Sequence, residues 1–405
     1  MNLPAGEGNA VRGTRGDAQM STLTSERNRG VDLLRFIMIV CVVAMHGAMS
    51  FMQHVPPWWY VIDPRQSLGF TFFVVIIDTF PMAVLFFLAG YFTPASLAAK
   101  GPALFIQSKV QRLALPWLLG VVFIGPCLAQ ASIVSLGFGP LPIADLLSAF
   151  FIGENYQQGP FWFLGVLFFF MTAYAARVAF LPARSLADKA PMPAPENKPD
   201  YKIALTIVFI LSSLSYALSS LHIAPVDGWI DVGRILFFQP ARIVGYAAFF
   251  LLGAYASQKN WFRSEGWRPN IVVWGVLTLF SFLLKLMWAV VPSALPSFTE
   301  LHPLQAALCG GAAYTLSALS ATLFFVGAFS RINSAIPRIF RFFIPYSFGI
   351  YWLHMAVQLP LLQLCRSIEL PTAVLWLGTL CLTLCICSAL TAGVLKKTPI
   401  LRHIF

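Results

Sequence analysis

Ten apolar stretches, each about 20 residues long, divide this chain, and a helix of that length crosses the roughly 30 Å hydrocarbon core of a bilayer. They are centred on residues 33–53, 70–92, 113–134, 161–181, 203–222, 235–256, 271–291, 306–329, 343–363 and 372–394. Between 130 and 160, Gly and Pro break the pattern, and we interpret the short stretch from Asp145 to Phe151 as re-entrant or interfacial. The sequence predicts an all-α integral membrane protein with about ten transmembrane helices.

The composition excludes soluble alternatives. Only 11% of the residues are charged and 58% are hydrophobic, whereas an ordinary soluble domain has about 25% charged residues. The net charge of +11 could suit nucleic acid, but no nucleic-acid-binding motif accompanies it, and we predict no nucleic-acid partner. Cys381, Cys385 and Cys387 have no His or carboxylate nearby, so we also predict no metal site.

The positive charges predict the orientation. With ten spans, 20 of the 27 Lys and Arg residues fall on the side of the N-terminus, and only Arg65, Arg234 and Arg366 fall in loops on the other side. Because cytoplasmic loops are enriched in Lys and Arg, both termini are expected to be cytoplasmic.

The chain is expected to contain one membrane domain, residues 29–395. Residues 1–28 are polar, without apolar periodicity, and predict a disordered cytoplasmic tail. The Pro-rich segment 182–202 predicts a cytoplasmic linker between the fourth and fifth spans, and residues 396–405 a cytoplasmic C-terminal tail.

The first span contains two ionisable residues on one face. Arg35 and His46 are 11 residues apart, which is about three helical turns and a rise of about 16 Å. Arg35 then lies at the cytoplasmic end, where Asp32 can pair with it, and His46 lies in the outer third of the membrane. From spacing alone, Arg35 could equally extend to the lipid headgroups and His46 could be a packed core residue.

Four further ionisable residues lie inside other predicted spans, and counting residues from the span ends puts them near the level of His46. They are Asp78, Arg242, Lys285 and His354. An ionisable group inside a membrane is costly, so these residues predict a buried polar site with paired charges. Packing between helices would explain one or two of them better than all of them.

Two clusters lie at the predicted membrane surfaces. Lys109 and Arg112 share a helix face at the cytoplasmic entry to the third span, where they could bind an anionic ligand or simply anchor the helix. The outer segment 153–162, which ends at Trp162, combines amide and aromatic side chains and could form the mouth of a site for a sugar-like acceptor. An interfacial aromatic belt is an equally good interpretation.

These residues form part of six motifs that occur in the order typical of one family. The first runs from Arg29 to Arg35 and has ten residues between Arg35 and His46. The others are FFLAGYF at 86–92, KVQRLALPW at 109–117, FWFL at 161–164, FFLLG at 249–253 and SFGIYWLH at 347–354. Together the motifs resemble the membrane acyltransferase-3 family of bacterial O-acyltransferases that modify cell-envelope glycans, and the chain is most similar in style to the glucan-modifying members.

The resemblance implies an enzyme of the bacterial cytoplasmic membrane that moves an acyl group, expected to be acetyl, from cytoplasmic acyl-CoA to a hydroxyl of an extracytoplasmic glycan or lipid-linked glycan. It implies His46 and Arg35 as catalytic residues, and Arg35, Lys109 and Arg112 as ligands of the donor phosphates. His46 would be either a general base or a transient acyl carrier. Acyl-CoA would be a co-substrate, with no tightly bound cofactor.

The remaining polar residues are expected to line the substrate site: Asp32, Asp78, Trp162, Arg242, Lys285, Tyr351 and His354. The alternative interpretation of the same residues is a secondary transporter or flippase in which the buried charges form a proton relay.

Overall fold

The computed structural model describes residues 29–180, 201–262, 266–294, 301–332, 336–399 and 401–405. The predicted tail 1–28 and nearly all of the predicted linker 182–202 lie outside the described residues. Most of the described chain is helical, and eight of its helical stretches are long and apolar enough to cross a membrane. The chain is therefore a multi-pass membrane protein.

The main helices follow most of the predicted apolar stretches, but the predicted span 70–92 is interrupted at residues 78–80. They are α2 (Arg29–Met49), α3 (Leu68–Ile77), α4 (Pro81–Lys109), α6 (Gly125–Ser135), α8 (Trp162–Phe180), α9 (Tyr201–His222), α10 (Pro240–Gln258), α11 (Ile271–Ala294), α12 (Pro303–Phe329), α14 (Ser347–Cys365) and α15 (Thr372–Leu390). Shorter elements are α5 (Leu115–Leu119), α7 (Ile143–Phe151) and α13 (Arg338–Phe343), with π-helical turns at Val110–Ala114, Gly120–Ile124 and Thr391–Leu395.

One of the eight membrane-crossing stretches, Leu68–Ser135, is too long for a single crossing. Its 68 residues would extend about 100 Å as one straight helix, more than three times the thickness of the hydrocarbon core. The backbone leaves the helical conformation at Gly101, where φ is 71°, a value that glycine adopts easily. α10 is not among the eight, although it packs along α4 and α9.

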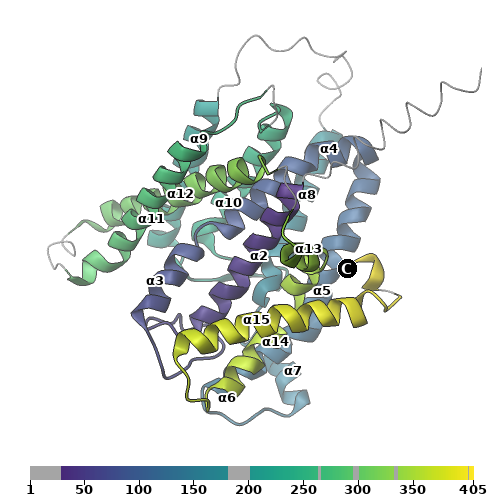
Figure 1. The fold of residues 1–405 in the computed structure, drawn as a ribbon, viewed down its shortest axis with the longest axis vertical. Coiled ribbons are helices and arrows are strands. Elements are labelled where there is room, and N and C mark those ends of the chain that lie inside the picture. Colours follow the sequence, from purple (N-terminus) through teal and green to yellow (C-terminus); the bar gives the residue numbers. More distant parts are fainter. Residues whose placement is uncertain (1–28, 181–200, 263–265, 295–300, 333–335, 400) are drawn as a thin grey trace, which may run out of the picture.

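α2 lies in the middle of the molecule, where it contacts α3, α4, α12, α14 and α15 (Figure 1). α9, α10, α11 and α12 form a group on one side of it, and α14, α15, α6 and α7 lie toward the other side. The C-terminal Phe405 packs against Phe348 and Trp352 of α14. Residues of α2 are therefore surrounded by protein along most of their length.

The structure corrects the start of the sixth predicted span, which was placed at residue 235. Residues 236–238 form strand β2 (Leu236–Phe238), which pairs antiparallel with β1 (Ile230–Val232), and α10 begins only at Pro240. Proline is well suited to the first turn of a helix because it has no N–H group to leave unpaired there. The connecting turn contains Gly233 and Arg234, both with positive φ. The all-α prediction is thus modified by one small hairpin.

Candidate active site

A break between α3 and α4 places Asp78 inside the protein. α3 ends at Ile77, Asp78 is its C-cap, and α4 restarts at Pro81, whose ring cannot continue the preceding helix. Lys285 of α11 supports this break, because its Nζ donates hydrogen bonds to the Val75 carbonyl at 2.7 Å and to the Thr79 hydroxyl. A cation at the C-terminal end of a helix is favourable, so Lys285 stabilises the end of α3.

Asp78 forms a two-point ion pair with Arg242 in the first turn of α10. The Nη1 and Nη2 atoms of Arg242 lie 2.8 and 2.5 Å from the two carboxylate oxygens of Asp78. The Arg242 side chain is only 8% exposed, and the ring of Tyr314 lies within about 5 Å of both the Arg242 guanidinium and Lys285 Nζ. The structure therefore pairs Asp78, whose side chain is 33% exposed, with the buried Arg242.

His46 forms the centre of a second polar pair. Its Nδ1 lies 2.8 Å from Nε2 of His354, which is completely buried on α14, and the planes of the two rings are parallel to within 3°. Nδ1 of His354 lies 2.6 Å from the backbone oxygen of Tyr351. A carbonyl oxygen can only accept, so we assign the proton of a neutral His354 to Nδ1, and its Nε2 must accept from His46 Nδ1–H.

This assignment leaves Nε2 of His46 as the unprotonated nitrogen of a neutral ring. Among the described residues, that nitrogen has no hydrogen-bond partner. It can therefore accept a proton or attack an electrophile, the two roles predicted from the sequence.

Hydrogen bonds from α14 and α15 fix the turn of α2 that carries His46. Gln358 Nε2 donates to the Val43 carbonyl at 3.0 Å, and Trp376 Nε1 donates to the Ala44 carbonyl at 2.9 Å. Gly47 makes the approach of Gln358 possible, because a Cβ atom there would lie 2.5 Å from Gln358 Nε2. The position of His46 is thus determined by two neighbouring helices.

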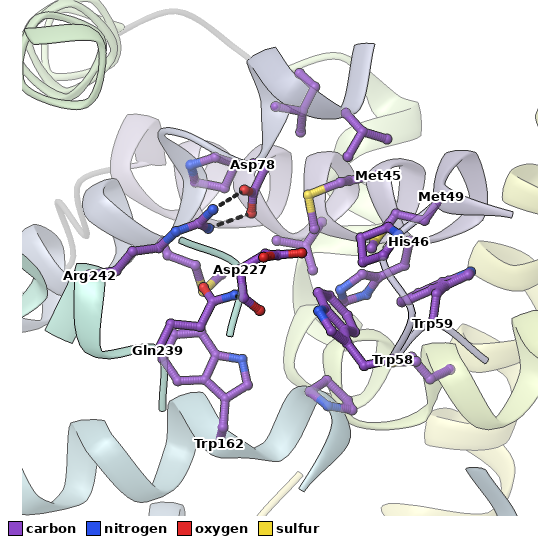
Figure 2. Close-up of a pocket in the computed structure, with 18 of the residues that line it drawn as sticks. Met45, His46, Met49, Trp58, Trp59, Asp78, Trp162, Asp227, Gln239 and Arg242 are labelled. Carbon is purple, nitrogen blue, oxygen red and sulfur yellow. Dashed lines mark hydrogen bonds and ion pairs between the residues drawn. The ribbon is translucent and has the colours of Figure 1, made fainter. Parts of the chain in front are cut away.

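His46, Asp78 and Arg242 line one cavity of about 200 Å³, together with the predicted residues Trp162 and Tyr351 (Figure 2). Tyr351 also holds the wall in place, since its hydroxyl donates to the Pro160 carbonyl. His354 and Lys285 do not line this cavity but lie behind His46 and the α3 end, respectively. Of the residues predicted to share one level, His46, Asp78 and Arg242 therefore line one cavity, and the other two lie outside it.

Several cavity residues were not predicted. They come mainly from loops and the ends of helices: Trp58, Trp59, Tyr60, Asp227, Trp229, Gln239, Tyr246 and Met355. Asp227 has no ion-pair partner among the described residues, and Figure 2 shows its carboxylate near the middle of the cavity. The run of aromatic residues Trp58–Tyr60 could have indicated part of this cavity from the sequence. Asp227, a single aspartate in a loop, has no feature in the sequence that marks it as a cavity residue.

The predicted donor-binding residues gather elsewhere. Arg35 pairs with Asp32 at 3.5 Å, as predicted, and its guanidinium lies over the ring of Phe92. Lys109 ends α4, Arg112 lies three residues later in the following π-helical turn, and the Phe92 ring below Arg35 belongs to the same α4 helix. None of these three cations lines the His46 cavity.

No group of three His, Cys, Asp or Glu side chains that could hold a metal ion occurs within the described ranges. The cysteines of these ranges, including Cys381, Cys385 and Cys387, are all free.

The family model of the acyltransferase domain, Acyl_transf_3, matches residues 28–392. No curated protein and no solved structure matches the chain. Because the family match covers nearly the whole sequence, the chain belongs to the acyltransferase-3 family and is a membrane acyltransferase that transfers acyl groups other than aminoacyl groups.

Proposed function

We propose that this enzyme transfers an acetyl group from cytoplasmic acyl-CoA to a hydroxyl of an extracytoplasmic glycan, either free or lipid-linked, in the bacterial cytoplasmic membrane. The proposal rests mainly on two consecutive hydrogen bonds, from His354 to the Tyr351 carbonyl and from His46 to His354. They leave Nε2 of His46 unprotonated beside a cavity. Such a nitrogen suits acyl transfer to a hydroxyl, because the hydroxyl must lose its proton during the reaction.

In the general-base route, Nε2 of His46 removes the proton of the acceptor hydroxyl while its oxygen attacks the thioester carbonyl carbon. The new C–O bond forms, the C–S bond breaks, and the proton passes from His46 to the departing thiolate of CoA. In the alternative route, Nε2 attacks the thioester carbon first, and the C–S bond breaks as the CoA thiolate leaves. The acceptor hydroxyl then attacks the acyl carbon, the bond between that carbon and Nε2 breaks, and the hydroxyl proton passes to the thiolate. His354 supports both routes by keeping the proton of His46 on Nδ1.

The acyl donor would be bound at the cationic region of Arg35, Lys109 and Arg112. Lys109 and Arg112 have no carboxylate partner among the described residues, so their charges are available for the phosphates of CoA. Arg35 and His46 are separated by about 16 Å along α2, and the flexible arm of CoA would span this distance with its thioester at His46.

The acceptor would bind in the cavity from the opposite side. Indole rings of Trp58, Trp162 and Trp229 provide flat apolar walls, and Asp227 and Gln239 provide hydrogen-bonding groups for hydroxyls. This combination suits a sugar, which has apolar ring faces and a polar edge.

The topology follows from the same proposal. Division of the Leu68–Ser135 stretch at Gly101, together with α10 as a further span, converts the eight membrane-crossing stretches into ten spans with both termini cytoplasmic. The donor site at the start of α2 would then face the cytoplasm, and the His46 cavity would open to the outside.

The test uses the purified protein in detergent with acetyl-CoA and a cell-envelope glycan fraction from a strain that lacks it. We expect release of the CoA thiol to accelerate when glycan is added, and mass spectrometry to show one acetyl group added per thiol released. A secondary transporter or flippase would leave the thioester intact. An unchanged thioester in the presence of glycan would overturn the proposal.

A further inference from the structure

A second cavity lies beside the His46 cavity, and the two share part of their walls. It has a volume of about 340 Å³ and is lined by α6, by the loop that contains Glu154, and by the β1–β2 hairpin. Trp58, Tyr60 and Trp229 line both cavities. We call this second space the outer cavity. Its volume is within the range of small-ligand sites.

A continuous series of aromatic rings leads from one cavity to the other. Trp162 in the His46 cavity contacts Trp229 at 5.6 Å between ring centroids, and Trp229 stacks on Phe237 in the outer cavity at 5.0 Å and 8°. Phe237 in turn contacts the ring of Tyr156. Flat aromatic faces of this kind can pack against the apolar faces of successive sugar rings.

The two cavities are separated by Trp58 and Trp229, whose rings meet edge to face at 5.9 Å. The indole N–H groups of both residues are buried and have no acceptor among the described residues. Moving these rings apart would therefore break no hydrogen bond of either indole, and it would offer two donors to sugar oxygens.

Arg234 links the segments that form the frame of the outer cavity. Its guanidinium donates to the Gly153 and Ile152 carbonyls at 2.7 and 3.3 Å and lies over the ring of Tyr156. Burial raises the pKa of Tyr156, whose hydroxyl donates to the Arg234 carbonyl at 2.6 Å. These backbone contacts occupy N–H groups of the guanidinium, and Arg234 does not itself line the outer cavity.

The polar groups that line the outer cavity are neutral or acidic. They are the hydroxyl groups of Tyr60, Ser132 and Tyr156, the amides of Asn155 and Gln157, and the carboxylate of Glu154. No Lys or Arg side chain is among the lining residues. This set can bond sugar hydroxyls but would disfavour phosphate or carboxylate groups.

We propose that the outer cavity is a second sugar subsite, which binds a neutral sugar unit adjacent to the one acylated at His46. This inference rests on the proposed function, and it adds that the acceptor is an oligosaccharide of at least two units with a neutral unit next to the acylated one. An acceptor of one sugar would fill only the His46 cavity and lose the contacts of the outer cavity.

The test compares acceptors of different length. Neutral envelope glycan is hydrolysed, and its fragments of one, two and four sugars are used with the purified enzyme and acetyl-CoA. For the wild type, kcat/KM is expected to rise at least about tenfold from one sugar to two. The rise comes from hydrogen bonds and ring contacts in the outer cavity.

Ser132→Trp places a large side chain of α6 in the outer cavity. The kcat/KM for the two-sugar fragment, divided by that for the one-sugar fragment, should then fall toward one. The matched control is Ser148→Trp on α7, where the serine is exposed and does not line the cavity; it should keep the wild-type ratio. The double variant Glu154→Ala/Asn155→Ala removes only polar groups from exposed positions. It should lower the ratio several-fold even if Ser132→Trp does not fold.

Equal use of one and two sugars by the wild type would overturn the subsite, and so would an unchanged ratio in the double variant. Failure of the wild type to acylate a fragment of any length would instead count against the proposed acceptor class, and the subsite would fall with it.

Discussion

His46 has two ring nitrogens with different surroundings, and the proposed chemistry depends on that difference. Nδ1 is bound to His354, and Nε2 borders the cavity. The motif with ten residues between Arg35 and His46 identified His46 from the sequence. Its pairing with His354 could not be predicted, because 308 residues separate the two and only the packing of α2 on α14 brings them together.

The first prediction concerns His354. His354→Ala removes the group that holds the proton on Nδ1 of His46, so kcat should fall by about 10- to 1000-fold while the KM for the donor changes little. The control is His54→Ala, which alters an exposed histidine in the loop after α2. Both constants are measured by steady-state kinetics. An unchanged kcat in His354→Ala would show that His354 has no part in the mechanism.

The second prediction separates donor binding from chemistry. Arg112 is exposed and does not line the His46 cavity, so it can contact the phosphates of acyl-CoA but not the reacting carbonyl. A charge-assisted phosphate contact contributes about 1.5–3 kcal/mol, and Arg112→Ala should raise the donor KM by about one to two orders of magnitude with kcat nearly unchanged. If kcat were lost at saturating donor while KM stayed the same, donor entry at this region would be wrong.

At the scale of elements, the FFxxG motifs at 86–90 and 249–253 allow α4 and α10 to pack closely. α4 and α10 cross where a Cβ on Gly90 would lie 1.9 Å from the Phe250 carbonyl oxygen, and a Cβ on Gly253 would lie 2.0 Å from that of Phe87. Each motif thus provides the glycine that admits a carbonyl of the other, a close approach typical of small residues between membrane helices. The sequence showed both motifs, but their mutual contact appears only in the structure.

The third prediction tests this crossing. In Gly253→Ala the new methyl group would lie 2.0 Å from the Phe87 carbonyl oxygen, so α4 and α10 must move apart at this point. We expect a loss of stability of about 1–3 kcal/mol, measured by thermal unfolding in detergent, together with reduced turnover.

Gly378→Ala in α15 provides the control for Gly253→Ala, because a Cβ there would meet nothing within 4 Å. Alanine is also the better helix former, so this variant should be as stable as the wild type or more so. The crossing would have no importance for stability if Gly253→Ala unfolded at the same temperature as Gly378→Ala.

At the scale of the whole molecule, the length of the apolar stretches predicted a membrane fold and most of the long helices, because apolar length is a local property of the sequence. The hairpin at 230–238 was missed because Leu236, Phe237 and Phe238 continue the apolar pattern of α10, and only Pro240 marks its start. The predicted site residues were those that are unusual in a membrane. Trp58, Asp227 and Trp229 are ordinary loop residues and reach the cavity only through the fold.

The fourth prediction tests the orientation. In a variant without native cysteines, Ala103→Cys should react with an impermeant thiol reagent only from the cytoplasm, and Ser367→Cys only from the outside. Both side chains are exposed at opposite ends of proposed spans. Labelling of the two cysteines from the same side would contradict the ten-span arrangement.

The central claim is that His46 transfers an acyl group to an envelope glycan, and mass spectrometry of glycans from living cells tests it most directly. A strain that lacks the enzyme is complemented with the wild type, His46→Ala or His54→Ala at equal membrane levels. The account predicts acetylated glycan with the wild type and His54→Ala, and a decrease of about 10²- to 10⁴-fold in the initial rate of acetylation with His46→Ala. Glycan acetylation at the wild-type rate in cells that contain only His46→Ala would contradict it.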